Sequence, residues 1–277
     1  MISVKSFINF MTTNSGLLLL GSANYYAIST FDKYISNRFI KLFFILCITL
    51  SKNYILIHAI NYMLRHHSYI NNTQTQRLSS IKEKYKGEFH INIIQSSIVE
   101  SLAIVYIQTI LPLHSNILYD IITFIPKSLL FELIFDFFHY WTHRYMHYNK
   151  TLYRYSHKKH HTYKYPTTYI TFYQHPLDII LTNAIPLFLT LYILKRYFVI
   201  SYYLFTIINT YKTHTEIAGH SGKDVHKSSS FPQCMWLVKL LNIELYTHDH
   251  DKHHSKSSQC NYSKRFIIWD KIFKTYK

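Results

Sequence analysis

The sequence predicts an all-α fold: an integral membrane helical protein with a histidine-rich helical cap. Three observations support this fold class. Hydrophobic residues make up 48% of the 277 residues and charged residues only 16%, while the helix breakers Gly and Pro number just 5 and 6. Several apolar segments approach the roughly 20 residues that a bilayer-spanning helix needs. Histidines also recur at spacings that place them on one face of a helix.

The first membrane candidate is the apolar segment 39–60, which Lys41 and Lys52 interrupt. A polar stretch, 62–89, follows it and carries five basic residues (Arg65, Arg77, Lys82, Lys84 and Lys86). The positive-inside rule places such a stretch in the cytosol.

Two further apolar segments, 91–113 and 117–138, are each near the length of a membrane span. Only residues 114–116 separate them, so we expect an antiparallel hairpin that returns the chain to the cytosol at His139. Residues 1–138 are therefore expected to form N-terminal membrane-anchoring helices.

Residues 139–277 are expected to form a histidine-rich region with an inserted apolar segment, 177–210. Lys195 and Arg196 lie in the middle of this insertion. It therefore fits either a membrane hairpin or a re-entrant pair of interfacial helices. In both cases its two ends lie on one side, so that residues 211–277 share the cytosol with the earlier histidines. A soluble helical protein with a large core is the alternative, but several apolar runs with basic flanks favour the membrane.

The net charge of +16 raises nucleic acid as a partner. No zinc-finger, RRM or helix-turn-helix signature accompanies the charge, so we expect no nucleic acid partner. Anionic lipid headgroups fit better, because the charges flank apolar runs. The three cysteines (Cys47, Cys234 and Cys260) have no pair spacing and are expected to be free thiols on a reducing side.

Eight histidines form three patterns. His143 and His147 make H-x-x-x-H, and H-x-x-H-H occurs twice, at 157–161 and at 250–254. Positions i, i+3 and i+4 of a helix share one face, so each pattern can direct its imidazoles to one point. A lone histidine is usually an ordinary surface or core residue, whereas repeated patterns favour a metal site. So many imidazoles exceed the four ligands of one structural zinc, which suggests two metals with open positions. Oxygen chemistry would favour iron, and zinc or copper remain open.

The order and spacing of these motifs resemble the fatty acid hydroxylase/sterol desaturase superfamily, and C-4 methylsterol oxidases most. The resemblance covers roughly residues 130–275. It rests on DFFHYWTHRYMHYNKTLYRYSHKKHH, HPLD (175–178), HSG (220–222), HDKHH (250–254), NY (261–262) and WDKIF (269–273). It departs at Lys274, where the family usually has Gly, and at Lys223, where the methylsterol oxidases tend to have Tyr. Both departures leave the substrate open.

The resemblance implies an enzyme of the endoplasmic reticulum membrane with a non-haem di-iron centre on its cytosolic face. The implied iron ligands are His143, His147, His157, His160, His161, His220, His250, His253 and His254. His139 and His175 also match family positions, and for these two ligation and packing are equally open.

Asp136 and Asn261 are candidates for supporting this site from outside the ligand sphere. Asp136 shares a helix face with His139 and His143, so that it could accept a ring N–H of a ligand or pair with Arg144. Asn261 could orient a ligand or a water. Trp269 and Asp270 are expected to lock the C-terminal segment under the site. The remaining histidines are expected to be ordinary: His214 and His248 exposed to solvent, and His66, His67 and His114 in loops or interfaces.

The implied reaction is the O2-dependent oxidation of an unactivated C–H bond of a lipid, and the first hypothesis is the C-4 methyl group of a sterol. The chain has neither a dinucleotide-binding glycine fingerprint nor a C-x-x-C-H haem motif, so an external donor must supply electrons. Cytochrome b5 is the donor that the resemblance implies. A sterol C-5 desaturase or a fatty acid, sphingolipid or alkane hydroxylase remains an alternative. A non-catalytic protein that binds metal or lipid is an alternative of a different class.

Overall fold

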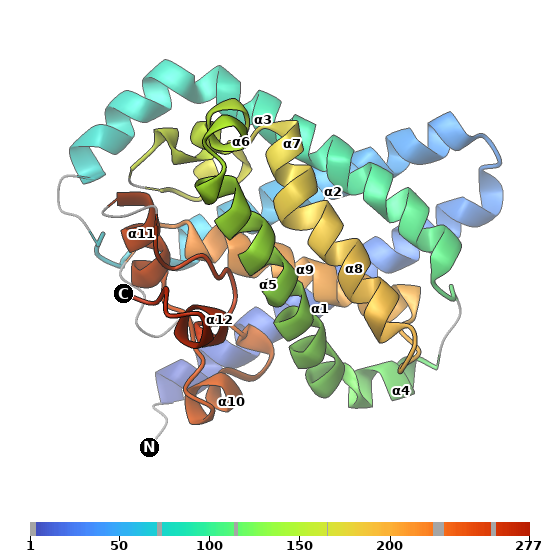
Figure 1. Ribbon diagram of the computed structural model, residues 1–277. Coiled ribbons are helices and arrows are strands. Elements are labelled where there is room, and N and C mark those ends of the chain that lie inside the picture. Colours follow the sequence, from blue (N-terminus) through green and yellow to red (C-terminus); the bar gives the residue numbers. More distant parts are fainter. Residues whose placement is uncertain (1–3, 71–73, 114–115, 165, 224–229, 256–258) are drawn as a thin grey trace.

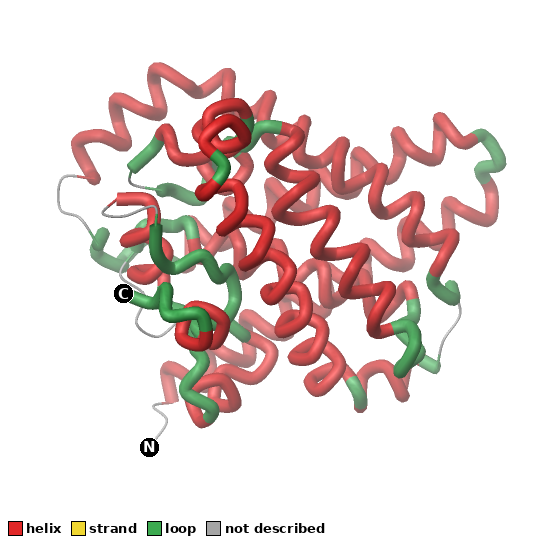
Figure 2. Tube along the Cα trace, in the orientation of Figure 1, coloured by secondary structure: helices red, strands yellow, loops and turns green. Residues whose placement is uncertain are grey.

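The computed structural model describes residues 4–70, 74–113, 116–164, 166–223, 230–255 and 259–277. Helices of the α, 3-10 and π types make up the regular structure of these residues (Figure 2). Extended pairing within them is confined to two isolated bridges, Tyr69 with Lys223 and Glu244 with Phe266. The predicted all-α fold class is confirmed.

Three long helices begin the chain: α1 (Val4–Tyr34), α2 (Arg38–Met63) and α3 (Gln74–Ile110). The side chain of Asn37 caps α2 by accepting the backbone N–H groups of Phe39 and Ile40, at 2.9 and 3.3 Å. Within the described residues, three helical segments are long and apolar enough to cross a membrane, namely Arg38–Met63, Gly87–Ile110 and Pro176–Leu194.

The outer face of α3 carries a continuous apolar stripe. Its exposed residues recur every three or four positions: Ile91, Ile94, Ile98, Leu102 and Tyr106. This period keeps them on one side of the helix, while the opposite side packs against α2. Only Tyr106 of these five makes a ring contact, with Phe188, and an exposed apolar stripe of this kind is what a lipid-facing helix presents.

The expected span 117–138 does not form one helix. The chain instead forms a short α4 (Ile117–Ile122), turns at Thr123, and continues as α5 (Phe124–Tyr148). Pro126 fits the first turn of α5, where a missing backbone N–H costs no helical hydrogen bond. Residues 91–113 and 117–138 were expected to form an antiparallel hairpin. They do not pack against each other as a pair, since α5 packs chiefly against α8. The expected boundary after residue 138 lies inside α5.

The insertion forms two helical arms that are joined by a turn. Its outward arm joins α7 (Pro176–Ile179), a π-helical turn (Ile180–Ala184) and α8 (Ile185–Leu194), and α9 (Tyr202–Gly219) returns. The turn between the arms holds Lys195, whose Nζ donates to the carbonyl of Ile110 at 2.7 Å. The expectation that both ends of the insertion lie on one side of a membrane stays a prediction. Figure 1 shows α5 and α8 side by side.

Short elements make up the rest: α6 (Lys150–Tyr155), two 3-10 turns (His157–Thr162 and Ile170–Phe172), a third (Pro232–Cys234), α10 (Met235–Leu240), α11 (Thr247–Ser255) and α12 (Ile268–Ile272). One large hydrophobic core joins the N-terminal helices to α5, α8 and α9. The N-terminal helices and the histidine-bearing half thus share a core.

Candidate metal centre

Four segments carry the predicted histidines to one end of the fold. The last turns of α5 present His143 and His147, and the 3-10 turn after α6 presents His157, His160 and His161. His220 ends α9, and α11 presents the remaining three histidines of the second H-x-x-H-H pattern. All nine predicted ligands lie within these segments, and the structure brings all nine together.

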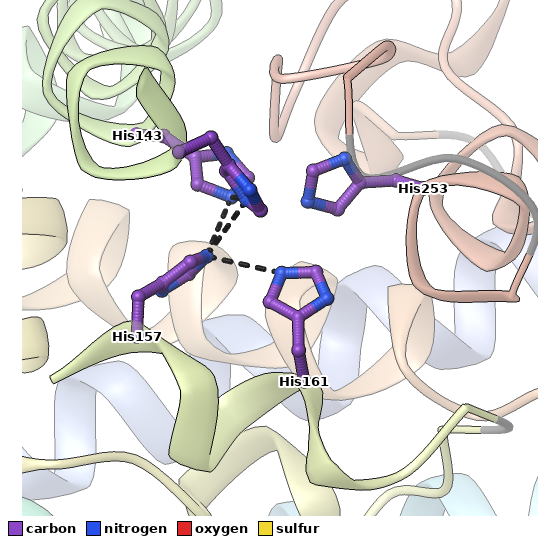
Figure 3. A group of neighbouring side chains, drawn as sticks. His143, His157, His161 and His253 are labelled. Atoms are coloured by element: carbon purple, nitrogen blue, oxygen red, sulfur yellow. Dashed lines mark hydrogen bonds between the residues drawn. The ribbon is translucent and has the colours of Figure 1, made fainter. Parts of the chain in front are cut away.

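The nine histidines divide into two groups, in each of which all candidate ligand nitrogens lie within 4.8 Å of one another. The first group contains His143, His147, His157, His161 and His253. The second contains His160, His220, His250 and His254. Figure 3 shows four rings of the first group converging from α5, the 3-10 turn and α11.

Each H-x-x-H-H pattern serves both groups. His157 and His161 join the first group, while His160 between them joins the second. In α11 the assignment is reversed, because His250 and His254 join the second group and His253 joins the first. In each pattern, the two histidines that are four residues apart therefore belong to the same group. The histidine three residues after the first belongs to the other group.

Hydrogen bonds at the outer nitrogens orient the rings of the first group. The Nδ1 atoms of His143 and His253 donate to the carbonyls of Tyr262 and Cys260, at 2.8 and 2.7 Å. The Nδ1 of His157 lies 3.0 Å from a carboxylate oxygen of Asp178. Carbonyls and carboxylates only accept, so these Nδ1 atoms carry the hydrogen and the Nε2 atoms of the three rings face inward.

The inward nitrogens fit a bound cation. The Nε2 atoms of His143 and His157 are 3.0 Å apart, and in the neutral rings both are lone pairs that repel each other. Other Nε2 pairs lie at 3.1 and 3.2 Å in the first group and at 2.9 to 3.3 Å in the second. Nitrogens that bind one ion at about 2.1 Å lie about 3.0 Å apart at right angles and about 3.4 Å apart in a tetrahedron. An imidazole-only donor set suits Fe, Zn, Cu or Ni.

The second group has less outer support. His220 donates from Nδ1 to the carbonyl of Glu216 at 2.8 Å, within the last turn of α9. The buried Nδ1 atoms of His160 and His254 have no hydrogen-bond partner. Ring contacts join the two groups, since His161 and His254 stack with centroids 4.5 Å apart.

Burial favours the neutral form of eight of the nine histidines, which are His143, His147, His160, His161, His220, His250, His253 and His254. Desolvation lowers the pKa of His143, His160, His161, His250 and His254 well below the usual value, and repulsion from neighbouring imidazoles lowers it further. Burial also lowers the pKa of His253 to about 3 and that of His220 to about 4. Neutral imidazole is the form that binds a metal.

His139 and His175 lie outside both groups. The Nδ1 of His139 donates to the carbonyl of Thr182 at 2.7 Å, and its ring stacks on Phe135. His175 caps α7, because its Nδ1 accepts the backbone N–H of Leu177 at 3.2 Å. The structure thus gives both residues roles in packing and capping.

Asp136 and Asn261 support backbone segments rather than histidine rings. The carboxylate of Asp136 accepts three consecutive backbone N–H groups, those of residues 264–266, at 2.7 to 3.0 Å. The predicted bond to a histidine and the predicted pair with Arg144 are both wrong, since Asp136 faces a loop that is remote in sequence. The side chain of Asn261 bonds the carbonyls of Asp249 and Lys277 and the N–H of Lys277. It ties the C-terminal segment to α11.

Asp270 locks the C-terminal segment as predicted. Its carboxylate accepts the N–H groups of Tyr262 and Ser263, at 2.9 and 2.8 Å, and the hydroxyl of Thr275 at 2.7 Å. Trp269 donates its indole N–H to the carbonyl of Leu133 at 3.3 Å. The carbonyl of Tyr262 accepts the hydrogen bond from the ring of His143. The contacts of Asp270 therefore lie directly behind the first group.

The predictions for the other histidines have mixed outcomes. His248 is exposed as expected, and His66 and His67 lie in the turn after α2, as expected for loop residues. The expectation for His214 is wrong: it is partly buried on α9, its Nδ1 is enclosed, and burial lowers its pKa to about 4. His114 lies outside the described residues.

Two features were missed at the level of sequence. Asp178, in the HPLD stretch, is fully buried and orients His157. Behind His220, Glu216 pairs with Lys212, Lys264 and Arg265, at 2.9, 2.9 and 3.1 Å. Burial alone would raise the pKa of Glu216, but these three cations together hold that pKa well below its usual range. The HPLD motif, which ends at Asp178, was the signal in the sequence.

The comparisons with known proteins agree with the site. Residues 128–275, or 148 of 277, match the family model described as fatty acid hydroxylase, and this match contains all nine grouped histidines. The chain is 36% identical over 149 residues to a fatty acid hydroxylase of Lecanicillium sp. and 34% identical over 149 residues to a C-4 methylsterol oxidase of Schizosaccharomyces pombe. Each match covers 53% of this chain.

The same matches cover 40% and 45% of those relatives, so the chain spans less than half the length of the curated relatives it matches. No solved structure gives a significant match.

Proposed function

Because this chain belongs to the fatty acid hydroxylase family, we propose that it is a membrane-bound di-iron oxygenase that hydroxylates an unactivated C–H bond of a lipid. The C-4 methyl group of a sterol is the proposed position. The relative from Schizosaccharomyces pombe, a C-4 methylsterol oxidase, supports this substrate.

One observation carries the proposal. Two adjoining groups of buried and half-buried histidines bring their Nε2 atoms together, and the donor set contains no carboxylate or thiolate. Nine imidazoles are more than one ion can hold, so the two groups fit two ions with coordination positions left for O2. Two irons bound there would supply the redox chemistry that transfers an oxygen atom from O2 to carbon.

The chain itself contributes orientation and exclusion of water. The carbonyls of Tyr262 and Cys260, the carboxylate of Asp178 and the carbonyl of Glu216 fix four of the nine rings. Ligand rings held by outer hydrogen bonds bind a metal more tightly, because they need no reorientation. His147 and His161 are less buried than the other seven, so the first group lies nearer the protein surface.

We place the site on the cytosolic face of the endoplasmic reticulum membrane, with cytochrome b5 or a similar chain as the electron donor. The basic residues of 62–89 support this orientation through the positive-inside rule. The three membrane-length segments and the apolar stripe on α3 support insertion into the bilayer.

Hydroxylation of a fatty acid is the second candidate function. The similarity to a fatty acid hydroxylase of Lecanicillium sp., at 36% identity, favours it. The two functions share the metal centre and differ in the lipid, so that product analysis after supplying each lipid separates them.

The first experiment measures the metal content of detergent-purified protein. We expect about two irons per chain in the wild type and a loss of iron in both His253→Ala, from the first group, and His160→Ala, from the second. His248→Ala is the matched control, because His248 is exposed on the same helix as His253. One zinc or no metal, unchanged in both variants, would rule out the di-iron oxygenase.

A further inference from the structure

An aromatic chain leads from the first histidine group to the protein surface. The ring of Tyr262 contacts three histidine rings of this group, with centroids 5.5 to 5.7 Å apart. Tyr262 also contacts Tyr140 edge to face at 6.0 Å, and Tyr140 contacts Trp141 in the same way at 5.5 Å. Tyr140 is fully buried, whereas Trp141 is 42% exposed. The three side chains therefore connect the buried histidines to the surface.

The hydroxyl of Tyr140 takes part in a directed chain of hydrogen bonds. Nη1 of Arg144 donates to the Tyr140 oxygen at 2.9 Å. The Thr275 hydroxyl donates its single hydrogen to a carboxylate oxygen of Asp270 at 2.7 Å. The Tyr140 hydroxyl and Oγ1 of Thr275 are 3.0 Å apart, so Tyr140 must be the donor of this bond. The proton of Tyr140 is thus two hydrogen bonds from a fully buried carboxylate.

This arrangement exceeds what packing requires. A buried tyrosine hydroxyl usually has a hydrogen-bond partner, and Arg144 alone would supply one. Oxidation of a phenol by one electron releases its proton, so that a redox-active tyrosine needs an acceptor within hydrogen-bond reach. Tyr140 has such a path to Asp270, and tyrosine and tryptophan are the aromatic side chains that lose an electron most readily. The aromatic chain therefore meets both requirements of a relay for single electrons.

The proposed chemistry creates a need for such a relay. When O2 reacts at a metal centre without a lipid in place, the nearest side chains become the groups that are oxidised. In the first group those side chains are the histidine ligands themselves. An electron supplied from the protein surface would prevent this damage.

We propose that Tyr140 is a one-electron relay, which reduces the metal of the first histidine group from the protein surface when O2 has reacted without a lipid. The inference rests on the proposed function and adds a protective step to it. Tyr140 gives up one electron through the ring of Tyr262. Its hydroxyl proton moves to Thr275, which passes its own proton to Asp270.

A small soluble reductant such as ascorbate completes the cycle. It supplies one electron to Tyr140 through Trp141, which is the most exposed of the three tryptophans. The protons then return along the same two hydrogen bonds. Tyr140 is restored, and the net change is the transfer of one electron from the reductant to the metal.

The relay is tested first in metal-free protein in detergent, so that the result does not depend on iron loading or on turnover. Azide radicals from pulse radiolysis oxidise exposed tryptophans by one electron, and the radicals of tryptophan and tyrosine have distinct optical spectra. We expect the tryptophan radical to convert into a tyrosine radical at a rate independent of protein concentration. Tyr140→Phe, which keeps the ring, and Trp141→Phe should each lower the yield of this step at least fivefold.

Three further variants test the path. Trp236→Phe is the matched control and should leave the yield unchanged, because Trp236 packs on Phe10 at 4.5 Å. Thr275→Val removes the proton path and should slow the step at least fivefold, whereas Thr275→Ser keeps the hydroxyl and should retain the rate. A wild-type yield in Tyr140→Phe would overturn the relay while leaving the metal centre intact.

The protective role is tested in protein whose iron content has been measured, which keeps the outcome separate from a failure of the proposed function. Wild type and Tyr140→Phe are incubated with O2 and ascorbate but without lipid, and mass spectrometry then maps oxidised side chains. We expect oxidation of His143, His147 and His253 to be at least threefold greater in Tyr140→Phe. Equal oxidation of these histidines in the two proteins would overturn the protective role.

Discussion

The carboxylate of Asp178 lies 3.0 Å from Nδ1 of His157, and both side chains are buried. This contact joins the start of the inserted apolar segment to the first histidine group. A carboxylate behind a ligating histidine fixes the ring and raises its basicity as a ligand. The insertion is thus attached to the proposed metal centre through a side chain as well as through the backbone.

We expect Asp178→Ala to weaken metal binding at the first group about 10- to 100-fold, the usual effect of removing such a support. Iron content after dialysis against a chelator should fall from about two to about one per chain, because the second group does not contact Asp178. Asp120→Ala is the control: Asp120 is also buried but lies far from the histidines and bonds Ser201. Full retention of iron in Asp178→Ala would show that the contact is only structural.

The depressed histidine pKa values predict that acid destabilises the metal-free protein. An unfolded histidine titrates near pH 6.5, whereas the buried histidines titrate lower, as in His220 at about 4. Between these values the unfolded chain holds more protons, so that stability is greatest above pH 6.5 and is lost as the pH falls towards the folded pKa. Each such histidine contributes a slope of about 1.4 kcal/mol per pH unit.

Thermal melting in detergent with a chelator, at pH 7.5 and at pH 5.5, measures this effect. The melting temperature should fall markedly at the lower pH. His254→Leu should reduce the pH dependence, because it removes one buried histidine, and His248→Ala should not, because His248 is exposed. A melting temperature that does not change with pH would mean that the histidines are solvated without metal.

The backbone at Lys274 predicts a stabilising substitution. Lys274 has φ of 55°, in the left-handed region that favours glycine, directly after α12. The resembling family usually has Gly here, and the structure supplies the reason. We expect Lys274→Gly to raise the free energy of unfolding by about 1 kcal/mol.

Lys271→Gly is the matched comparison for this prediction. Lys271 is exposed inside α12, where glycine costs about 1 kcal/mol of helix stability, so the two substitutions should have opposite signs. Denaturant unfolding in detergent measures both. A loss of stability in Lys274→Gly would mean that the lysine side chain contributes more than the strain costs.

Local sequence patterns predicted the long helices and eight of the nine grouped histidines, because both depend on spacing along one helix, whereas His220 was expected from the family resemblance alone. Two metals were suggested by the number of histidines, but which histidine belongs to which group could not be predicted. His160 and His161 are adjacent in sequence, yet they face different groups, since the packing of α5, α9 and α11 decides which partner each ring meets. The same holds for Asp136, whose three backbone partners lie about 130 residues away. A helical wheel shows on which face of α5 Asp136 lies, but it does not show which loop packs over that face.

The break at Thr123 was missed for a different reason. Residues 117–138 are apolar enough for a membrane helix, but Lys127, Glu132 and Asp136 are buried and have partners within the fold. Lys127 donates to the carbonyl of Val199, and Glu132 pairs with Arg265 at 2.8 Å. Hydropathy averages over such residues and cannot tell an inward charge with a partner from an outward charge in lipid.

The close contact of α1 with α9 gives the last prediction. A Cβ added to Gly21 would lie 3.1 Å from the backbone Cα of Ile207, which a helix in the core cannot easily move. Gly16, on the same helix, has nothing within 4 Å of an added Cβ. Alanine in place of glycine inside a helix normally gains about 1 kcal/mol. We therefore expect Gly16→Ala to stabilise the protein by about that amount.

Gly21→Ala should instead destabilise the protein by about 1 to 3 kcal/mol, because overpacking outweighs the gain in helix propensity. Melting temperatures of the two variants in the same detergent give the comparison. Since α9 ends at His220, separation of α1 from α9 should also lower iron retention by the second histidine group in Gly21→Ala but not in Gly16→Ala. Equal stabilisation by both substitutions would show that the two helices can move apart without cost.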